Sequence, residues 1–272
     1  MIDQANLKMK AGAIIACERV SGKNDNMSTS HFHSFFELYY LESGQRYHFI
    51  GEDVYHINPG EFVLFAPYVM HHSYGDKDVH FQRIVVYFSP SCLLSSELLQ
   101  QLKHSSGVYH FSPKECQQLY EYMQLLLHEE QQDALFSKET MHSLLHLLMI
   151  TFLRNQSPCI APEPQNRISK IVSYIHEHYE ETITLSFLSQ QFFMSPYHLC
   201  REFKRYTNST LIQYLNMTRI LHAQKMLQET TWSITQISQA TGFSNVTHFN
   251  RVFKSITGMT PSDHRRLGKQ TP

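Results

Sequence analysis

The clearest structural signal in the chain is the stretch SITQISQATGFSNVTHFNRVFKSITGMTP, residues 233–261. Ser233 with Gln236 three residues later is a capping box, which predicts that a helix begins there. Gly242 supplies the left-handed turn that a tight helix-turn-helix needs. After it, Phe249 and further apolar residues recur at helical spacing. The stretch therefore predicts a short helix, a tight turn and a second, amphipathic helix.

A second copy of this pattern lies about 50 residues earlier in the chain. Matching positions are 49 residues apart up to the turn and, after one inserted residue, 50 apart beyond it. The pairs are Leu185/Ile234, Leu188/Ile237, Gln190/Gln239, Ser195/Ser244, Leu199/Phe249, Arg201/Arg251, Phe203/Phe253, Lys204/Lys254, Thr207/Thr257 and Thr210/Thr260. Two copies indicate a duplicated helix-turn-helix module rather than a long repeat array.

The second helix of each copy has a polar, basic side opposite its apolar side. Arg can bind guanine and Asn can bind adenine through two hydrogen bonds, and Lys suits phosphate. Such residues also occur on ordinary solvated helix faces, but here two copies share the pattern, and residues 161–272 hold 12 Lys and Arg against 7 Asp and Glu. We therefore predict a surface for double-stranded DNA. Its residues are Tyr197, His198, Cys200, Arg201, Lys204 and Arg205 in the first copy, and Asn245, Thr247, His248, Asn250, Arg251 and Lys254 in the second.

Residues 168–266 resemble the AraC/XylS-type DNA-binding domain of bacterial transcription regulators, mainly through the 233–261 stretch. The resemblance implies two recognition helices in successive major grooves, RNA polymerase as a partner, and activation of transcription. It also adds Val246 to the base-contacting residues of the second copy. The first copy departs from the family pattern, because Phe193 stands at the turn glycine and Asn208 at the glycine after the recognition helix. Asn tolerates left-handed backbone and bulky Phe does so poorly, so we expect the first turn to be the less regular one.

The N-terminal half has a different pattern. Residues 11–90 show short segments rich in Tyr, Phe, Val and Ile, with turn signals every 8 to 12 residues, which predicts a small β sandwich or barrel. From about residue 113 the apolar period becomes helical, and the helix from about Lys138 to Arg154 is apolar on more than one side. One side can pack on the core, and we expect the other to form the contact of a homodimer.

Three prolines between residues 156 and 166 indicate a linker. The predicted fold is therefore multi-domain. An N-terminal domain over 1–155 combines a cupin-like β barrel with helices and serves effector binding and dimerisation. After the linker, residues 167–268 form an all-α, double helix-turn-helix domain.

The segment His31-x-His33-x-x-x-Glu37 resembles the first cupin motif, and Gly60 to His71 resembles the second. Three imidazoles and a carboxylate could bind a divalent transition metal, as in a metallo-cupin enzyme. AraC-type sensors resemble cupins in fold but mostly bind a small organic effector, often a sugar. The second motif carries Tyr68 in place of its glycine, which favours the organic effector. The predicted effector contacts are His31, His33, Glu37, Tyr39, Tyr47 and His71, the tyrosines as aromatic pocket walls with polar tips.

The sequence also limits the function. It has no Gly-rich phosphate loop and no Gly-x-Ser-x-Gly elbow, so we expect neither an enzyme nor a resident cofactor. Five cysteines without a Cys-x-x-Cys pair fit the reducing cytoplasm, and the longest apolar stretch, residues 144–153, is too short to cross a membrane. We predict a cytoplasmic, effector-responsive transcription regulator, with two alternatives. One is a metal-dependent cupin enzyme or metal sensor fused to a DNA-binding domain, and the other is a regulator gated by a protein partner.

Overall fold

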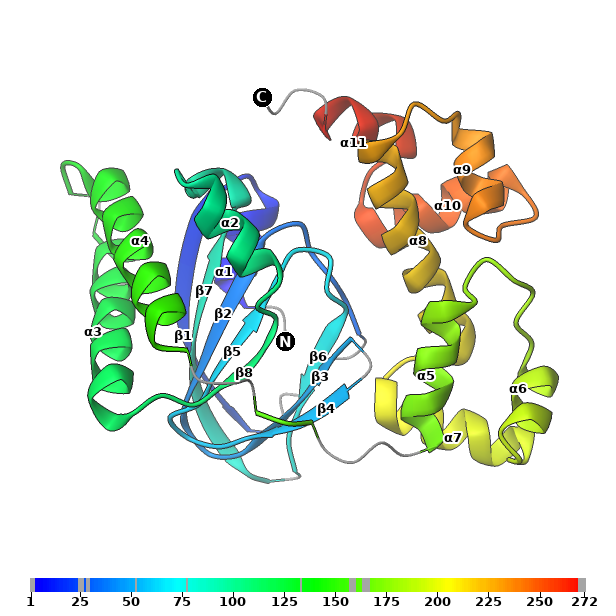
Figure 1. The fold of residues 1–272 in the computed structure, drawn as a ribbon, viewed down its shortest axis with the longest axis horizontal. Helices are drawn as coiled ribbons and strands as arrows, with labels where there is room; N and C mark the ends of the chain where they lie inside the picture. Colours follow the sequence, from blue (N-terminus) through cyan, green and yellow to red (C-terminus); the bar gives the residue numbers. More distant parts are fainter. Residues whose placement is uncertain are drawn as a thin grey trace. The chain divides into compact units, whose positions relative to one another are not determined.

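The chain divides into two compact units, shown in Figure 1. The computed structural model describes residues 3–23, 27, 30–51, 53–76, 78–132, 134–156, 160–162 and 167–268. The first unit consists of Met1–Ser28 and Phe32–Pro164, and the second of Thr29–His31 and Gln165–Pro272. The boundary falls inside the expected linker, of which residues 157–159 and 163–166 lie outside the described residues. A β-rich N-terminal domain followed by an all-helical one confirms the predicted fold class.

The first unit is built on two antiparallel sheets. The larger has the order β1-β7-β2-β5-β8 and contains β1 (Ile15–Lys23), β2 (Phe36–Ser43), β5 (Phe62–Phe65), β7 (His80–Phe88) and β8 (Gly107–Tyr109). The smaller has the order β4-β3-β6 and contains β3 (Arg46–Ile50), β4 (Asp53–Ile57) and β6 (His71–Tyr74). Gly44 takes the chain from one sheet to the other, and a Cβ there would lie 2.2 Å from the carbonyl oxygen of His80. Only glycine fits this turn.

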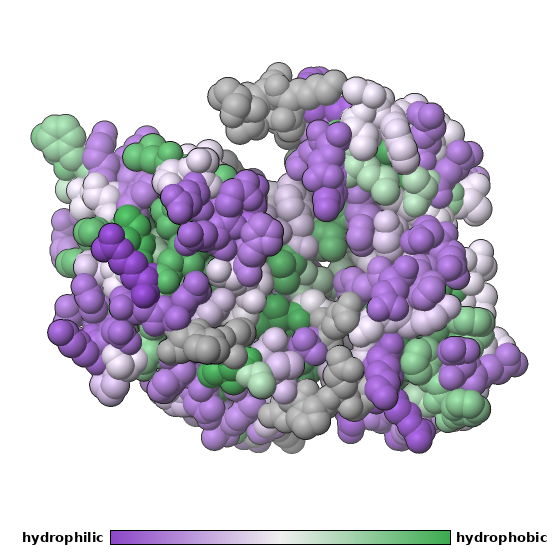
Figure 2. Space-filling view, viewed as in Figure 1, coloured by the Kyte–Doolittle hydropathy of each residue, from purple (hydrophilic) through white to green (hydrophobic). Residues whose placement is uncertain are grey.

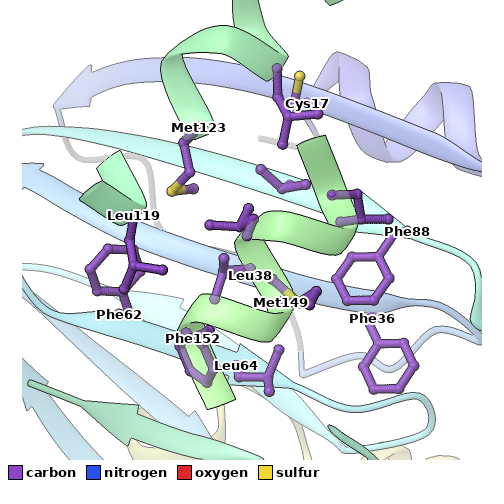
Figure 3. Packing of buried hydrophobic residues seen from close by; sticks show 14 of the residues in the cluster. Cys17, Phe36, Leu38, Phe62, Leu64, Phe88, Leu119, Met123, Met149 and Phe152 are labelled. Carbon is purple, nitrogen blue, oxygen red and sulfur yellow. The ribbon is translucent and has the colours of Figure 1, made fainter. Parts of the chain in front are cut away.

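Helices cover the outer face of the larger sheet. They are α2 (Ser96–Lys103), α3 (Pro113–Glu130) and α4 (Ser137–Asn155), with a short 3₁₀ turn at Pro90–Cys92. Figure 3 shows Leu38 of β2 and Leu64 of β5 packed among Met123 and Phe152 of the helices. Because side chains alternate along a strand, the odd-numbered residues of β2 face the other way, toward the space between the two sheets.

That inner space is closed in part by α1 (Gln4–Lys10). Ala5 and Met9 of this helix are buried in one apolar cluster with Tyr39, Phe65 and other inward-facing residues of the larger sheet. The predicted barrel interior is therefore a packed core with polar groups set into it, and it is these polar groups that define the candidate effector site.

Over residues 167–268 of the second unit, the regular elements that the structure describes are all helices. Its helices are α5 (Arg167–Glu177), α6 (Leu185–Gln191), α7 (Pro196–Thr207), α8 (Leu211–Glu229), α9 (Ile234–Ala240), α10 (Val246–Thr257) and α11 (Pro261–Gly268). The two helix-turn-helix units are α6 with α7 and α9 with α10, as the duplication predicts. Phe203 of α7 and Phe253 of α10 are both fully buried at matching positions.

No helix among the described residues is both long and apolar enough to span a membrane. The cysteines at positions 17, 92, 116 and 200 carry free thiols.

Candidate nucleic-acid interface and effector site

The recognition helices α7 and α10 present the residues that the sequence predicted. Each begins with a side-chain cap, Ser195 on α7 and Asn245 on α10, and each buries one apolar stripe. Because a stripe at helical spacing fixes which side is buried, the polar side of each helix faces solvent. Twelve of the thirteen predicted DNA contacts are exposed and Val246 is half-buried; the exposed ones are Tyr197, His198, Cys200, Arg201, Lys204, Arg205, Asn245, Thr247, His248, Asn250, Arg251 and Lys254.

Some of these side chains, Arg201 and Asn245 among them, already have partners within the unit. Arg201 donates to Glu202 over 3.2 Å, and Glu202 also pairs with Arg205. Asn245 uses its side-chain oxygen as the cap, because it accepts from the backbone amides of Thr247 and His248 over 2.7 and 3.2 Å. Asn245 therefore orients the first turn of α10, and only its amide nitrogen is left to contact a base.

The two helix-turn-helix units are connected by α8, and Arg219 on this helix reinforces the connection. Its guanidinium donates to the carbonyl oxygens of Tyr179 and Glu181, over 2.8 and 2.7 Å, and lies over the ring of Phe243. One side chain thus holds the loop before α6 and the turn before α10 together. Sequence reasoning did not single out Arg219, since its partners lie about 40 residues away.

Aromatic side chains add to the surface of the first helix-turn-helix unit. Phe187, Phe193 and Tyr197 are all exposed, Phe193 by 88% of its surface. Figure 2 shows hydrophobic residues over α6 and α7 beside hydrophilic ones. The first helix-turn-helix unit thus differs from the second, which has Gly242 at the turn position where the first has Phe193.

Inside the first unit, Glu37 lies between two histidines. Its Oε2 atom is 3.2 Å from Nε2 of His33 and 3.3 Å from Nε2 of His71. The Nδ1 atoms of both rings lie within 2.8 Å of backbone carbonyl oxygens, those of Phe35 and Val69. A carbonyl oxygen only accepts, so Nδ1 of each ring carries a proton and donates it. Both rings therefore present Nε2 to the carboxylate.

Burial and the contacts between Glu37 and the two histidines act on the pKa values of this cluster in opposite directions. Glu37 is fully buried, which by itself raises the pKa of its carboxyl, but the hydrogen bonds and charges of His33 and His71 together outweigh burial and hold that pKa well below its ordinary value. Burial lowers the pKa of His33, against the opposing effect of Glu37. The cluster is thus a buried carboxylate facing imidazole nitrogens, an arrangement that accepts a proton, a cation or a ligand hydroxyl.

The other predicted effector residues divide into two groups. Tyr39 is fully buried and faces the inner space, where its ring meets His48. Tyr47 lies on the opposite side of β3 from His48 and stacks on Tyr74, so the structure does not bring it to the cluster. His31 is half-buried and belongs to the short segment that groups with the second unit. The cluster within the first unit therefore consists of His33, Glu37 and His71.

The structure also places polar residues in the inner space that the sequence did not indicate. They are Asp3, Arg46, His48, Arg83 and Tyr87, all buried. Asp3 is the N-cap of α1, and its carboxylate accepts from Arg83 and from the hydroxyl of Tyr87. No local motif marks these residues, because the partners lie 80 or more positions apart.

Comparison with known proteins relates both units to one kind of regulator. Residues 13–145 match a family model described as an AraC-like ligand binding domain, and residues 188–267 match a helix-turn-helix domain. An uncharacterized HTH-type transcriptional regulator of Bacillus subtilis, YbfI, is 29% identical over 231 residues, which cover 80% of each chain. The HTH-type transcriptional activator RhaS of Escherichia fergusonii is 25% identical over 251 residues, or 87% of each chain. The crystal structure of ToxT from Vibrio cholerae is 15% identical, covers 94% of this chain and 99% of its own, and has a TM-score of 0.39.

Proposed function

This chain belongs to the AraC family of transcription regulators and combines a ligand-binding domain with a DNA-binding helix-turn-helix domain, and we propose that it acts as a cytoplasmic, homodimeric activator. In this proposal α7 and α10 read two successive major grooves of double-stranded DNA. A small organic effector, such as a sugar, binds in the inner space of the first unit. The activator contacts RNA polymerase when the effector shifts it to the active arrangement.

The observation that carries the DNA-reading part is the shared exposed face of α7 and α10. Both helices expose an Arg and a Lys at matching positions, Arg201 with Lys204 and Arg251 with Lys254. They are separated by α8, whose 19 residues correspond to about 28 Å of helix. That length suits one rigid connection between two readers of adjacent turns of the duplex.

The effector part is supported by the polar groups of the inner space. A buried carboxylate, two imidazoles and the Tyr39 ring lie on inward-facing positions of a β structure. Buried polar groups that converge among aromatic rings are typical of small-ligand sites. We propose His33, Glu37, Tyr39 and His71 as effector contacts.

A divalent metal is the second candidate for the same cluster. In metal sites, a histidine ligand commonly donates its other ring nitrogen to a backbone carbonyl, which fixes the tautomer. His33 and His71 both do so, and their Nε2 atoms and Glu37 would be the ligands. Two imidazoles with one carboxylate suit a first-row transition metal.

Dimerisation is supported by the outer faces of α3 and α4, which pack side by side. Leu125 of α3 is 50% exposed and Leu147 of α4 is 48% exposed. We propose that this face forms the homodimer contact, as expected from the apolar pattern of residues 138–154.

Footprinting of the full chain on a selected DNA site tests the reading mode. We expect protection over two successive helical turns on one face of the duplex, and loss of one turn when either Arg201 or Arg251 is replaced by Ala. Protection of a single turn in the unaltered protein would contradict the use of two recognition helices.

A further inference from the structure

The inner space of the first unit holds a carboxylate that the protein itself supplies. Asp3 is only 8% exposed, and its Oδ2 atom lies 3.3 Å from Nη2 of Arg83 and 3.0 Å from the hydroxyl of Tyr87. Arg83 is 3% exposed. Burial raises the pKa of Asp3 even though Arg83 lies beside it. The contacts of the Asp3 carboxylate with its neighbours therefore do not fully replace the water that it loses on burial.

Near this carboxylate, several buried nitrogen atoms make no hydrogen bond within the part of the chain that the structure describes. The Nε atom of Arg83 and both ring nitrogens of His48 are buried and have no hydrogen-bond partner among the described residues. The Arg83 guanidinium lies 5.4 Å from the ring centre of Tyr39, and the Tyr39 ring meets His48 edge-on at 4.4 Å. Asp3, Arg83, Tyr39 and His48 thus form one continuous row.

A buried polar group without a hydrogen-bond partner lowers the stability of the folded protein, unless a bound ligand or water supplies the partner. The guanidinium has a planar fork of donors that matches a carboxylate. Burial lowers the pKa of His48 well below its ordinary value, so the ring is neutral and offers one donor and one acceptor. A hydroxyl group uses both. The row therefore fits a molecule that carries a carboxylate next to hydroxyl groups.

The helix that brings Asp3 into the row, α1, is a short element. It has seven residues, and its buried apolar side chains are Ala5 and Met9. Asp3 lies directly before its first residue. A competing carboxylate therefore has to displace one short element rather than open the packed sheets.

We propose that the effector is a hydroxy carboxylic acid, such as a sugar acid, and that Asp3 occupies its carboxylate position in the free protein. Arg83 and Tyr87 bind the carboxylate, and His48 binds a hydroxyl. This inference rests on the proposed function, because it names the chemical class of the effector for the same inner space.

The first test needs no knowledge of the natural effector. Asp3→Ala leaves Arg83 and Tyr87 without their carboxylate, so the full-length variant should melt at a lower temperature, and formate or acetate should restore it. Chloride at equal ionic strength should not. The double variant Asp3→Ala with Arg83→Gln should show no rescue, and neither should Asp263→Ala, which removes a half-exposed carboxylate paired with Arg266. Absence of rescue by small carboxylates would overturn the proposal.

The second test compares acids with matched neutral compounds, galacturonate with galactose and gluconate with sorbitol, by calorimetry on the full chain. The acids should bind at least tenfold more tightly, Asp3→Ala should bind them more tightly still, and Tyr87→Phe should weaken them without unfolding the protein. Equal binding of a neutral sugar, unaffected by the Tyr87 change, would overturn the acid assignment. If that sugar also altered DNA binding, the proposed regulator would stand. If acids bound through this row without altering DNA binding, the regulatory role of the site would fail instead.

Discussion

Phe193 and Gly242 occupy the same position in the two helix-turn-helix units, and both have left-handed backbone, with φ of 52° and 79°. A Cβ at Gly242 would lie 2.6 Å from the carbonyl oxygen of Glu180, so packing requires glycine there. Phe193 is exposed, so its turn has room for a side chain. The departure of the first copy from the family pattern is therefore tolerated at a cost in backbone strain.

Phe193→Gly should stabilise the protein. Left-handed backbone costs a non-glycine residue about 1–2 kcal/mol, and the added freedom of glycine in the unfolded chain offsets about 0.5–1 kcal/mol of that gain. We expect a net increase of about 0.5–1 kcal/mol in the free energy of unfolding, measured by denaturant titration. Gly242→Ala is the matched opposite, with an expected loss of about 1–3 kcal/mol from overpacking. A destabilised Phe193→Gly protein would mean that the ring makes contacts worth more than the strain.

Arg251→Ala and Lys254→Ala should weaken DNA binding in different ways. We propose that Arg251 reads a base, so its loss should cost about 1–3 kcal/mol and relax the sequence preference at one position. Lys254 should anchor phosphate, so its loss should weaken binding to all sequences and lower the salt slope by about one. Titrations on specific and random DNA at several salt concentrations separate the two. Equal losses for Arg251→Ala on both DNAs would refute base reading.

Leu147→Glu should convert the proposed homodimer into folded monomers, because it places a charge in the proposed apolar contact at an exposed site. Sedimentation of the full chain measures the change, and circular dichroism checks the fold. Glu139→Lys on the same helix provides a charge-changing control outside the apolar face. A Leu147→Glu protein that stays dimeric would place the interface elsewhere.

Protein purified without added metal should contain much less than one metal ion per chain, and a chelator should leave DNA binding unchanged. The reason is that the inner polar groups serve an organic effector in the proposed function. Glu37→Ala should abolish the effector response and preserve basal DNA affinity, since the two units are separately compact. Elemental analysis decides the matter. Stoichiometric Fe, Mn, Ni or Zn that is lost in Glu37→Ala would establish the metal candidate instead.

The second unit should lose stability as the pH falls from about 6.5 toward about 4. Burial, with the charges of His176 and Lys225 adding to it, lowers the pKa of His222 from 6.5 to about 4. The unfolded chain therefore binds a proton in this range that the folded chain does not, and stability is lost as pH falls. His222→Gln, which keeps a planar group to stack on Tyr179, should flatten the dependence of the melting temperature on pH. An unchanged slope would assign the effect to other groups.

The helical half could be predicted closely from the sequence because its signals are local. Caps such as Ser195 and Ser233 and the apolar residues of α7 and α10 act within a few positions of one another. The duplication then supported the helix-turn-helix prediction, because both copies showed the same pattern. The substitution at the turn glycine also indicated the left-handed strain at Phe193. Local signals could not indicate that Asn245 would use its oxygen on its own helix.

The inner space of the first unit was harder to predict. Tyr39 and Tyr47 are both odd-numbered, and a continuous alternation would place them on one face. The register of β2 shifts between Leu41 and Ser43, and the chain then crosses to the other sheet, so the alternation does not carry over and Tyr47 faces outward. Asp3 and Arg83 meet only because distant strands and α1 pack together, and no spacing rule connects them.

The hydrogen bonds of Arg219 mean that the two DNA readers are not interchangeable parts. The loop that Arg219 holds belongs to the first reader, and the turn against which that loop packs belongs to the second. A chimaera that takes one reader from another regulator would have to bring a matching loop or turn with it. If the two units read two half-sites as proposed, an operator with one extra base pair between them should bind poorly. Arg219 as well as α8 holds the spacing and relative rotation of the units, so bending α8 alone would not restore the match.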